Sequence, residues 1–395
     1  MRRDPRVIAS AGVFTSALLA FVAIGAALPV LPAYVRGPLH AGDVAVGVVV
    51  GAFAITSVVC RPLAGRRADA HGRRVVLVAG SLSMAVGGVL YLLAASVPEL
   101  IVARLAVGAG EGAVYTAGAT WAVDLAHEDR RGLALGLFGL AVWGGLSLGP
   151  IAGELLRAHV GYDAVWALTA ALPLAGAVIA SRLPATTPAR IRAPSPYAWL
   201  PRAAYRPGIA LALANVGYAA LAGFVVLLLA SRGIGGGAGV FTAFAVAVFA
   251  SRIVLSHVPD RAGARATATV AALTEAVGLA VIALAHSLAL ALFGALVVGV
   301  GFSMLFPALA LTVIGAVDDD RRGSAMGAFT AFFDVGVGLG APLAGVTAAL
   351  AGYPAVFGLS AVAALGAAAL AARPAARRHA RPAPAAGAAS RPGVF

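Results

Sequence analysis

Four ionisable residues interrupt long apolar stretches of this sequence: Arg104, Glu111, Glu275 and Asp334. A charged side chain in such surroundings is costly unless it is paired or hydrated. A carboxyl group held there can bind and release a proton in response to a nearby cation or to a proton gradient. These residue types therefore indicate proton-linked binding inside an apolar protein.

The spacing of Arg104 and Glu111 places both on one face of a helix, two turns apart. The rise between them is about 10 Å, which is long for a direct bond, so we expect each to meet a neighbour, water or substrate as well. Asp334 is the expected second protonatable site. A structural, hydrogen-bonding acid is the alternative interpretation of both Glu111 and Asp334.

Three further residues belong to the expected substrate cleft, Tyr115, Asn215 and Tyr218, and Trp121 is another possible substrate contact. Tyr115 and Trp121 fall in the span that holds Arg104 and Glu111, whereas Asn215 and Tyr218 fall in the first span of the second half. Aromatic side chains at such positions more often pack against other helices or anchor the protein at a membrane interface. We therefore expect these residues near the ionisable ones, with packing as the alternative.

The elements that must position these residues are predicted by composition. A chain that is 61% hydrophobic and 11% charged has too little polar side chain for the surface of a soluble domain. Crossing a bilayer takes about 20 apolar residues. The sequence predicts an all-α integral membrane protein with twelve transmembrane helices, at residues 7–33, 44–63, 75–96, 99–123, 132–156, 164–183, 208–230, 240–257, 267–286, 288–316, 324–350 and 354–372.

The chain contains an internal repeat with a constant offset of 191 residues. The segment Asp129-Arg130-Arg131-Gly132-x3-Gly136-x8-Gly145-x3-Gly149 returns as Asp320-Arg321-Arg322-Gly323-x3-Gly327-x8-Gly336-x3-Gly340. The same offset relates Arg61 to Arg252, and Trp143 to Asp334. A constant offset across six spans predicts two pseudo-symmetric six-helix bundles in parallel orientation.

The predicted bundles occupy residues 1–183 and 208–372. Residues 184–207 are rich in proline and arginine, which is typical of an extended cytoplasmic linker. Residues 373–395 are rich in alanine, proline and arginine, and we expect a disordered cytoplasmic tail.

The net charge of +13 carries information about topology. Arginines gather in alternate loops, so the positive-inside rule places both termini and the linker in the cytoplasm. We expect the protein in the plasma (inner) membrane. This distribution is not that of a nucleic-acid-binding protein. The chain has no lysine, one cysteine and seven scattered histidines, so we expect no metal site and no cofactor.

One charged motif joins the second and third predicted spans: Gly65-x3-Asp69-x2-Gly72-Arg73-Arg74. Its twin is Asp260-Arg261-x-Gly263-x-Arg265. We expect Asp69 to cap the helix that starts at residues 322–324, and Asp260 the helix that starts at 131–133. Such contacts would lock the cytoplasmic ends of the halves together, whereas the alternative is a charged loop that only fixes topology.

Two glycine motifs complete the pattern. The first is Arg104-x3-Gly108-x-Gly110, and the second is Gly136-x8-Gly145-x3-Gly149-Pro150-x2-Gly153. Glycines allow close helix approach and Pro150 invites a bend, so the second motif predicts a hinge or tight seal, or else plain helix packing.

Together the three motifs resemble those of the major facilitator superfamily, up to about residue 372, and the last resembles the motif of its antiporter branch. The sequence departs from these patterns at Ala70, Glu154 and Ser256. The resemblance implies the major facilitator fold and places Glu275 on a peripheral helix.

It also implies a secondary active transporter, not an enzyme, that exports a small organic or amphiphilic compound in exchange for protons by alternating access. Its partners would be that substrate, protons and the lipid bilayer. One alternative is a proton-coupled uptake symporter, because the first span lacks an acidic residue. A remote alternative is a membrane-embedded transferase, but the paired Asp-Asp-x-x-Asp clusters that would hold magnesium diphosphate are missing from the sequence.

Overall fold

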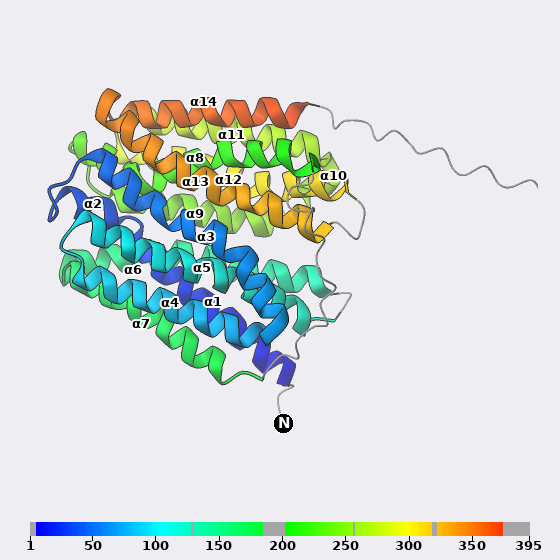
Figure 1. Ribbon diagram of the computed structural model, residues 1–395. Coiled ribbons are helices and arrows are strands. Elements are labelled where there is room, and N and C mark those ends of the chain that lie inside the picture. Colours follow the sequence, from blue (N-terminus) through cyan, green and yellow to red (C-terminus); the bar gives the residue numbers. More distant parts are fainter. Residues whose placement is uncertain (1–4, 128–129, 185–201, 256, 318–321, 374–395) are drawn as a thin grey trace, which may run out of the picture.

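The computed structural model describes residues 5–127, 130–184, 202–255, 257–317 and 322–373. These residues form helices and connecting turns, with no strand among them. The helices are α1 (Pro5–Ala27), α2 (Val30–Arg36), α3 (Asp43–His71), α4 (Arg73–Leu93), α5 (Val97–Leu125), α6 (Arg131–His159), α7 (Tyr162–Ser181), α8 (Arg202–Ser231), α9 (Gly237–Val254), α10 (Val258–Ala262), α11 (Ala264–Ala283), α12 (Leu288–Ile314), α13 (Arg322–Ala351) and α14 (Tyr353–Ala372) (Figure 1).

Twelve stretches of the described chain are long and apolar enough to cross a membrane. The first, Arg6–Arg36, combines α1 and α2, which are separated by a turn at Leu28 and Pro29. Helices satisfy their own backbone hydrogen bonds, which is required wherever lipid replaces water. The prediction of an all-helical, twelve-span protein is confirmed.

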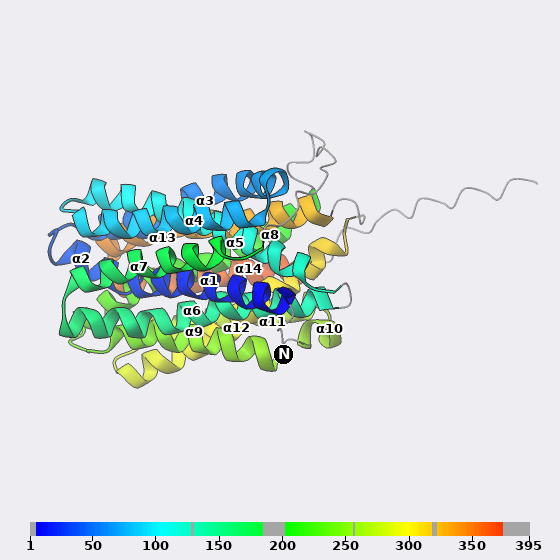
Figure 2. The same ribbon diagram turned by 90° about the horizontal axis from the view of Figure 1, so that it is seen from below.

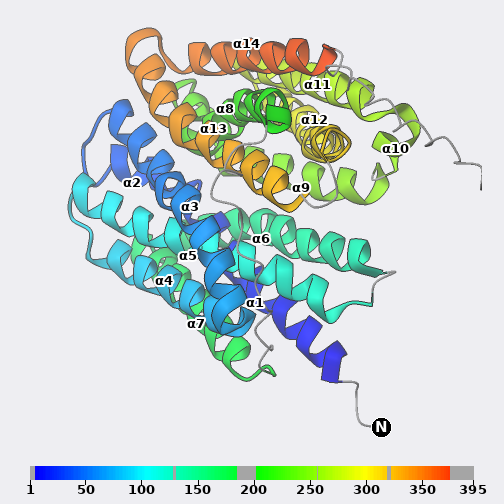
Figure 3. The same cartoon turned by 45° about the vertical axis from the view of Figure 1, so that its right-hand side comes forward.

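The helices form two groups that lie side by side, α1–α7 and α8–α14 (Figures 1 and 3). Within the first group α1 packs against α6 and α7, and α8 packs in the same way against α13 and α14. Likewise α4 packs against α5 and α7, and α11 against α12 and α14. The view from below places the first group in front and shows α1 between α6 and α7 (Figure 2). The repeat in the sequence is therefore a repeat in the packing.

Turn glycines follow the same repeat. Gly72 and Gly263, 191 positions apart, have φ values of 92° and 83°. Gly161 and Gly352 form a second such pair, at 116° and 79°. Backbone with positive φ strains residues that carry a Cβ, which explains glycine at these four turns.

The charged motif between the second and third spans is mostly helix and not a loop. Gly65 and Asp69 lie in the last two turns of α3, which continues beyond the expected end at residue 63 to His71. Gly72 alone separates α3 from α4. Helix α8 begins at Arg202, inside the stretch expected as a linker, of which residues 185–201 lie outside the described chain.

The two ends of the bundle differ in charge. We call the end at which α3 stops and α4 begins the arginine-rich end, because it holds Arg66, Arg67, Arg73, Arg74, Arg261 and Arg265. The opposite end, which holds α2 and the start of α3, is the arginine-poor end.

The halves are closed together at the arginine-poor end. There the first half of α3 packs against the second half of α13, and a Cβ added to Gly51 would lie 3.0 Å from Pro342 Cδ. The Tyr353 hydroxyl donates a hydrogen bond of 2.9 Å to Asp43 Oδ1, which joins the two halves.

At the arginine-rich end the start of α6 is loosely packed. Residues 130–137 are exposed, apart from the half-buried Ala134. Apart from the adjacent backbone of its own helix, no heavy atom of the described residues lies within 4 Å of a Cβ position at Gly136. Gly327, the equivalent residue of α13, is equally open.

The glycine motif of α6 provides a close contact with α1. A Cβ at Gly145 would lie 2.7 Å from Phe21 Cβ, and one at Gly149 would lie 2.6 Å from Gly25 Cα. Gly153 meets Ala26 in the same way, and Pro150 Cδ lies 3.1 Å from the Cβ position of Gly25. The motif thus packs α6 against α1 within one half, as the helix-packing interpretation of the motif expects.

We expect Gly149→Ala to destabilise the protein by about 1–3 kcal/mol, because the added methyl group overpacks the α1 contact. Gly136→Ala is the matched control in the same helix and should be neutral or slightly stabilising, since alanine favours helix by up to about 1 kcal/mol. Thermal unfolding in detergent compares the two variants. Equal effects at both positions would contradict the α1–α6 contact.

Candidate functional site

A central cavity lies between the two halves. It is lined from α1, α3, α5 and α6 of the first half and from α8, α9, α12 and α13 of the second. These are equivalent helices under the repeat. The atom-free space, including the part that opens to solvent, is about 900 Å³.

The lining is mainly apolar and aromatic, with four charged residues: Arg61, Glu111, Arg252 and Asp334. Tyr115 and Tyr218 also line it. Four of the six cleft residues expected from the sequence, Glu111, Asp334, Tyr115 and Tyr218, are therefore brought together at this cavity.

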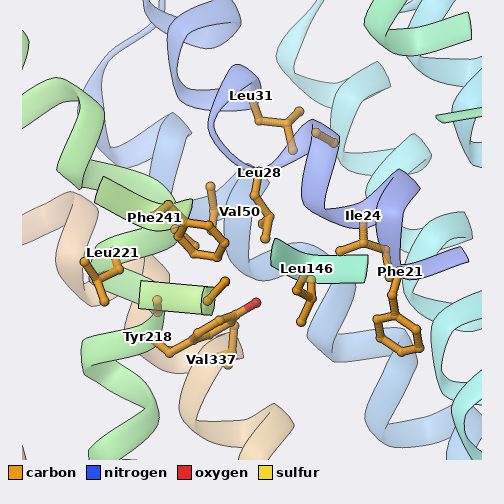
Figure 4. Close-up of a cluster of buried hydrophobic side chains, with 14 of the residues drawn as sticks. Phe21, Ile24, Leu28, Leu31, Val50, Leu146, Tyr218, Leu221, Phe241 and Val337 are labelled. Atoms are coloured by element: carbon orange, nitrogen blue, oxygen red, sulfur yellow. The ribbon is translucent and has the colours of Figure 1, made fainter. Parts of the chain in front are cut away.

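A cluster of buried apolar side chains lies between the two halves (Figure 4). Leu28 and Val50 come from the first half, and Leu221, Phe241 and Val337 from the second. Each of these side chains is buried. Because they come from both halves, their packing joins the halves.

Arg61 is the centre of an ion-pair cluster that joins the halves. Its Nε donates to Asp334 Oδ2 at 2.7 Å, and its Nη2 donates to Glu111 Oε1 at 3.1 Å. The Ser57 hydroxyl, one turn earlier on α3, donates to Glu111 Oε2 at 2.6 Å. Glu111 belongs to the same half as Arg61, whereas Asp334 belongs to the other half.

The charges in this cluster do not balance. The side chains of Arg61, Glu111 and Asp334 are only 13%, 7% and 1% exposed. One guanidinium group cannot neutralise two carboxylates, so the fully ionised cluster carries a net charge of −1 in an apolar setting. A proton on either carboxyl group removes that excess charge.

Arg252, the repeat equivalent of Arg61, has different surroundings. Its guanidinium carbon lies 5.7 Å from the centre of the Trp143 ring, and its Nε is buried without a hydrogen-bond partner among the described residues. Both acidic residues of the cavity lining contact Arg61 instead.

Arg104 differs from its expected role beside Glu111. It donates to the backbone oxygens of Val49, at 3.0 Å, and Val50, at 2.7 Å, and lies over the Phe53 ring. It lines a small separate pocket near Tyr91 rather than the central cavity. Arg104 therefore ties α5 to α3 within the first half.

Asn215 and Glu275 lie away from the central cavity. Asn215 is buried, and its amide donates to the Leu211 oxygen at 2.8 Å. Glu275 is buried on α11, and neither carboxyl oxygen has a hydrogen-bond partner among the described residues.

The charged motif at the arginine-rich end has a described contact within the first half. Arg73 bonds to Asp69, and its Nε donates to Asp124 Oδ2 at 3.1 Å, which connects α3, α4 and α5. The side chains of Asp260 and of residues 322–324 lie outside those described. The lock between Asp69 and the start of α13 stays a prediction, as does its twin at Asp260.

Sequence reasoning missed Arg61 as a site residue. The second span was expected to end at residue 63, which placed Arg61 at the membrane surface. Because α3 continues to His71, Arg61 lies two to three turns inside the helix. The sequence feature that could have identified Arg61 is the 191-residue offset, which relates it to Arg252.

Twelve spanning helices in two equivalent halves around a central cavity define a multi-pass membrane protein of the transporter class. The chain belongs to the Major Facilitator Superfamily, whose sequence profile matches residues 13–239 and 208–394.

Relatives support the same assignment over nearly the whole chain. The MFS-type transporter STM4428 of Salmonella typhimurium is 35% identical over 356 residues, which are 88% of this chain and 91% of that protein. The MFS-type transporter YhhS of Escherichia coli is 29% identical over 357 residues, 87% of this chain and 88% of that protein.

Solved structures show the same fold. A mutant form of the nucleoside transporter NupG has a TM-score of 0.78 at 14% identity, covering 92% of this chain and 99% of its own. The human organic anion transporter MFSD10 (TETRAN) has a TM-score of 0.72 at 20% identity, covering 93% of this chain and 100% of its own.

We expect Arg61→Met to destabilise the protein by about 3–5 kcal/mol, because it leaves two buried carboxylates without their cation. Arg252→Met is the matched control, since it removes the equivalent arginine, which forms no ion pair with the described residues, and it should cost much less. Thermal unfolding in detergent measures both. Adding Glu111→Gln and Asp334→Asn to Arg61→Met should recover much of the loss, and no recovery would contradict the charge argument.

Proposed function

We propose that this protein is a proton-coupled secondary transporter of a small organic compound, with Glu111 and Asp334 as the proton-binding residues. The observation that carries the proposal is the meeting of Arg61 with these two carboxyl groups, from opposite halves, in the central cavity. The sequence singled out both acids by their membrane depth and by the expectation that their spans face or border the cleft. Their common partner gives them a role in joining the halves.

The cluster couples protonation to the contact between halves. A proton on Asp334 removes the charge that attracts Arg61 across the interface, while the Arg61–Glu111 pair remains within the first half. A proton on Glu111 leaves Arg61 to pair with Asp334 alone, which strengthens the contact across the interface. Protonation of Asp334 thus weakens the contact between the halves, and protonation of Glu111 strengthens it. Alternating access requires such a difference between states.

The proposed orientation places the arginine-rich end and both termini in the cytoplasm of a cell with the protein in its plasma (inner) membrane. The positive-inside rule supports it. In that orientation, the α3–α13 contact closes the extracellular side. Residues 1–183 and 208–372 are the two moving bundles of this proposal, with residues 184–207 as linker.

The proposed direction is export in exchange for protons. It is supported by the α6 glycine motif, which resembles that of the antiporter branch. Uptake together with protons is the second candidate, and Arg252 favours it. Arg252 has no carboxylate partner among the described residues, which suits an anionic substrate. A bound anion attracts protons, whereas a bound cation would displace them.

The test begins with a drug-susceptibility and metabolite-retention screen of cells with and without the protein. Transport of each compound found is then driven by an imposed pH gradient in membrane vesicles. Glu111→Gln, Asp334→Asn and the double variant should lose gradient-driven transport, because each removes a proton-binding group.

Glu275→Gln is the control, since it neutralises a buried carboxyl group outside the cavity and should keep the coupling. Undiminished coupling in the double variant, or its loss in Glu275→Gln alone, would contradict the assignment. The direction of transport under the gradient decides between export and uptake.

A further inference from the structure

The two arginines of the central cavity have opposite surroundings. Arg61 contacts both acidic residues of the lining, Glu111 and Asp334. Arg252 lies over Trp143 at 5.7 Å, with its Nε buried and lacking a hydrogen-bond partner among the described residues. A buried cation of this kind is costly unless something else supplies the missing acceptor.

The repeat shows which groups are absent around Arg252. An offset of 191 residues relates Glu111 to Phe302 and Asp334 to Trp143. The repeat therefore keeps the arginine, and the positions around Arg252 hold aromatic residues where the positions around Arg61 hold carboxylates. Trp143 and Phe302 are themselves in contact, with ring centres 5.4 Å apart.

The aromatic surroundings continue along the cavity wall. Tyr218 stacks on Phe302 with ring centres 5.7 Å apart, and Phe333 lies 6.3 Å from the same ring. All of these residues line the cavity together with Arg252. An apolar ligand body would be buried against these rings, and a charged end would reach the guanidinium group.

We propose that Arg252 binds the anionic group of the transported compound, and that the substrate is an organic anion with an aromatic or apolar body. A carboxylate, sulfonate or phosphate supplies the acceptor oxygens that Arg61 receives from protein side chains. This inference rests on the proposed function in one respect: it takes the central cavity as the transport site.

The proposal also fixes the sign of the coupling to protons. The titratable groups that line the cavity with Arg252 are Arg61, Glu111, Tyr115, Tyr218 and Asp334. A bound anion adds negative charge beside a cluster that already carries an excess, so it favours protonation of a carboxyl group there. By linkage, protonation favours the anion equally. Binding of an anion should therefore take up protons, which favours the second candidate, uptake together with protons, over export in exchange for protons.

The experiment uses full-length protein in detergent and measures the shift in unfolding temperature as each probe is titrated. The anionic probes are 1-naphthoate, 1-naphthalenesulfonate and 1-naphthyl phosphate. Their matched controls are 1-naphthamide and 1-naphthylmethylammonium, which keep the ring without the negative charge. The anions should stabilise the wild type, and the neutral and cationic compounds should not.

Three variants tie this effect to Arg252. Arg252→Gln should weaken anion binding by roughly 30-fold or more, as removal of one partner of a buried charge pair does. Arg252→Lys keeps the charge and should retain part of the affinity. Trp143→Asp places beside Arg252 the carboxylate that Asp334 supplies to Arg61, so it should weaken anion binding well beyond the uncharged Trp143→Asn.

The outcomes separate this inference from the proposed function. Stabilisation by the cationic or neutral probes only, no stabilisation by any anion, or equal anion binding in wild type and Arg252→Gln would overturn the anion site. Proton uptake on anion binding is followed with a pH indicator in weak buffer. Suppose that anion binding depends on Arg252 but that neither the wild type nor the Glu111→Gln, Asp334→Asn double variant takes up protons on binding. This result would support the anion site and contradict the proposed coupling to protons.

Discussion

The structure depends on one arginine that is shared between carboxyl groups of two halves. Arg61 bonds to Glu111 in its own half and to Asp334 in the other, and all three side chains are largely buried. In a low-dielectric setting none of these charges is stable alone, so each fixes the position of the other two. The helices α3, α5 and α13 must therefore meet at this depth. The cavity around them follows from that requirement.

The internal duplication explains the arrangement of the helices, and the differences between the two copies explain the charged cluster around Arg61. Equivalent helices of both halves line the cavity, and equivalent arginines enter it from α3 and α9. The acids occur around one arginine, and aromatic residues replace them around the other. A symmetric ancestor would hold two equal sites. In this chain, one arginine is satisfied by the protein, and the other is available in the cavity.

Sequence reasoning predicted the fold because the constraints on it are local and repeated. Apolar runs give the spans, arginine distribution orders the loops, and a constant offset relates the halves. Glu111 and Asp334 were recognised because a carboxyl group at membrane depth is expensive wherever it points.

The contacts of each charged side chain were less predictable from the sequence. Residue spacing shows which residues share a helix face, but it does not show which neighbouring helix that face contacts. Arg104 shares a face with Glu111 but finds two backbone oxygens of α3 at 2.7 and 3.0 Å. Arg61 was missed because α3 extends beyond its apolar stretch. The contacts of Asp69 across the halves depend on residues outside the described chain.

The central claim is that protonation at Asp334 controls how the two halves meet. Spin labels at Ala70 and Ala262, both exposed and in opposite halves at the arginine-rich end, would report the distance between the halves in a Cys60→Ser background. The account predicts a distance distribution that changes between neutral and acidic pH in the wild type and that loses most of this change in Asp334→Asn. An equal pH response in wild type and Asp334→Asn would contradict it.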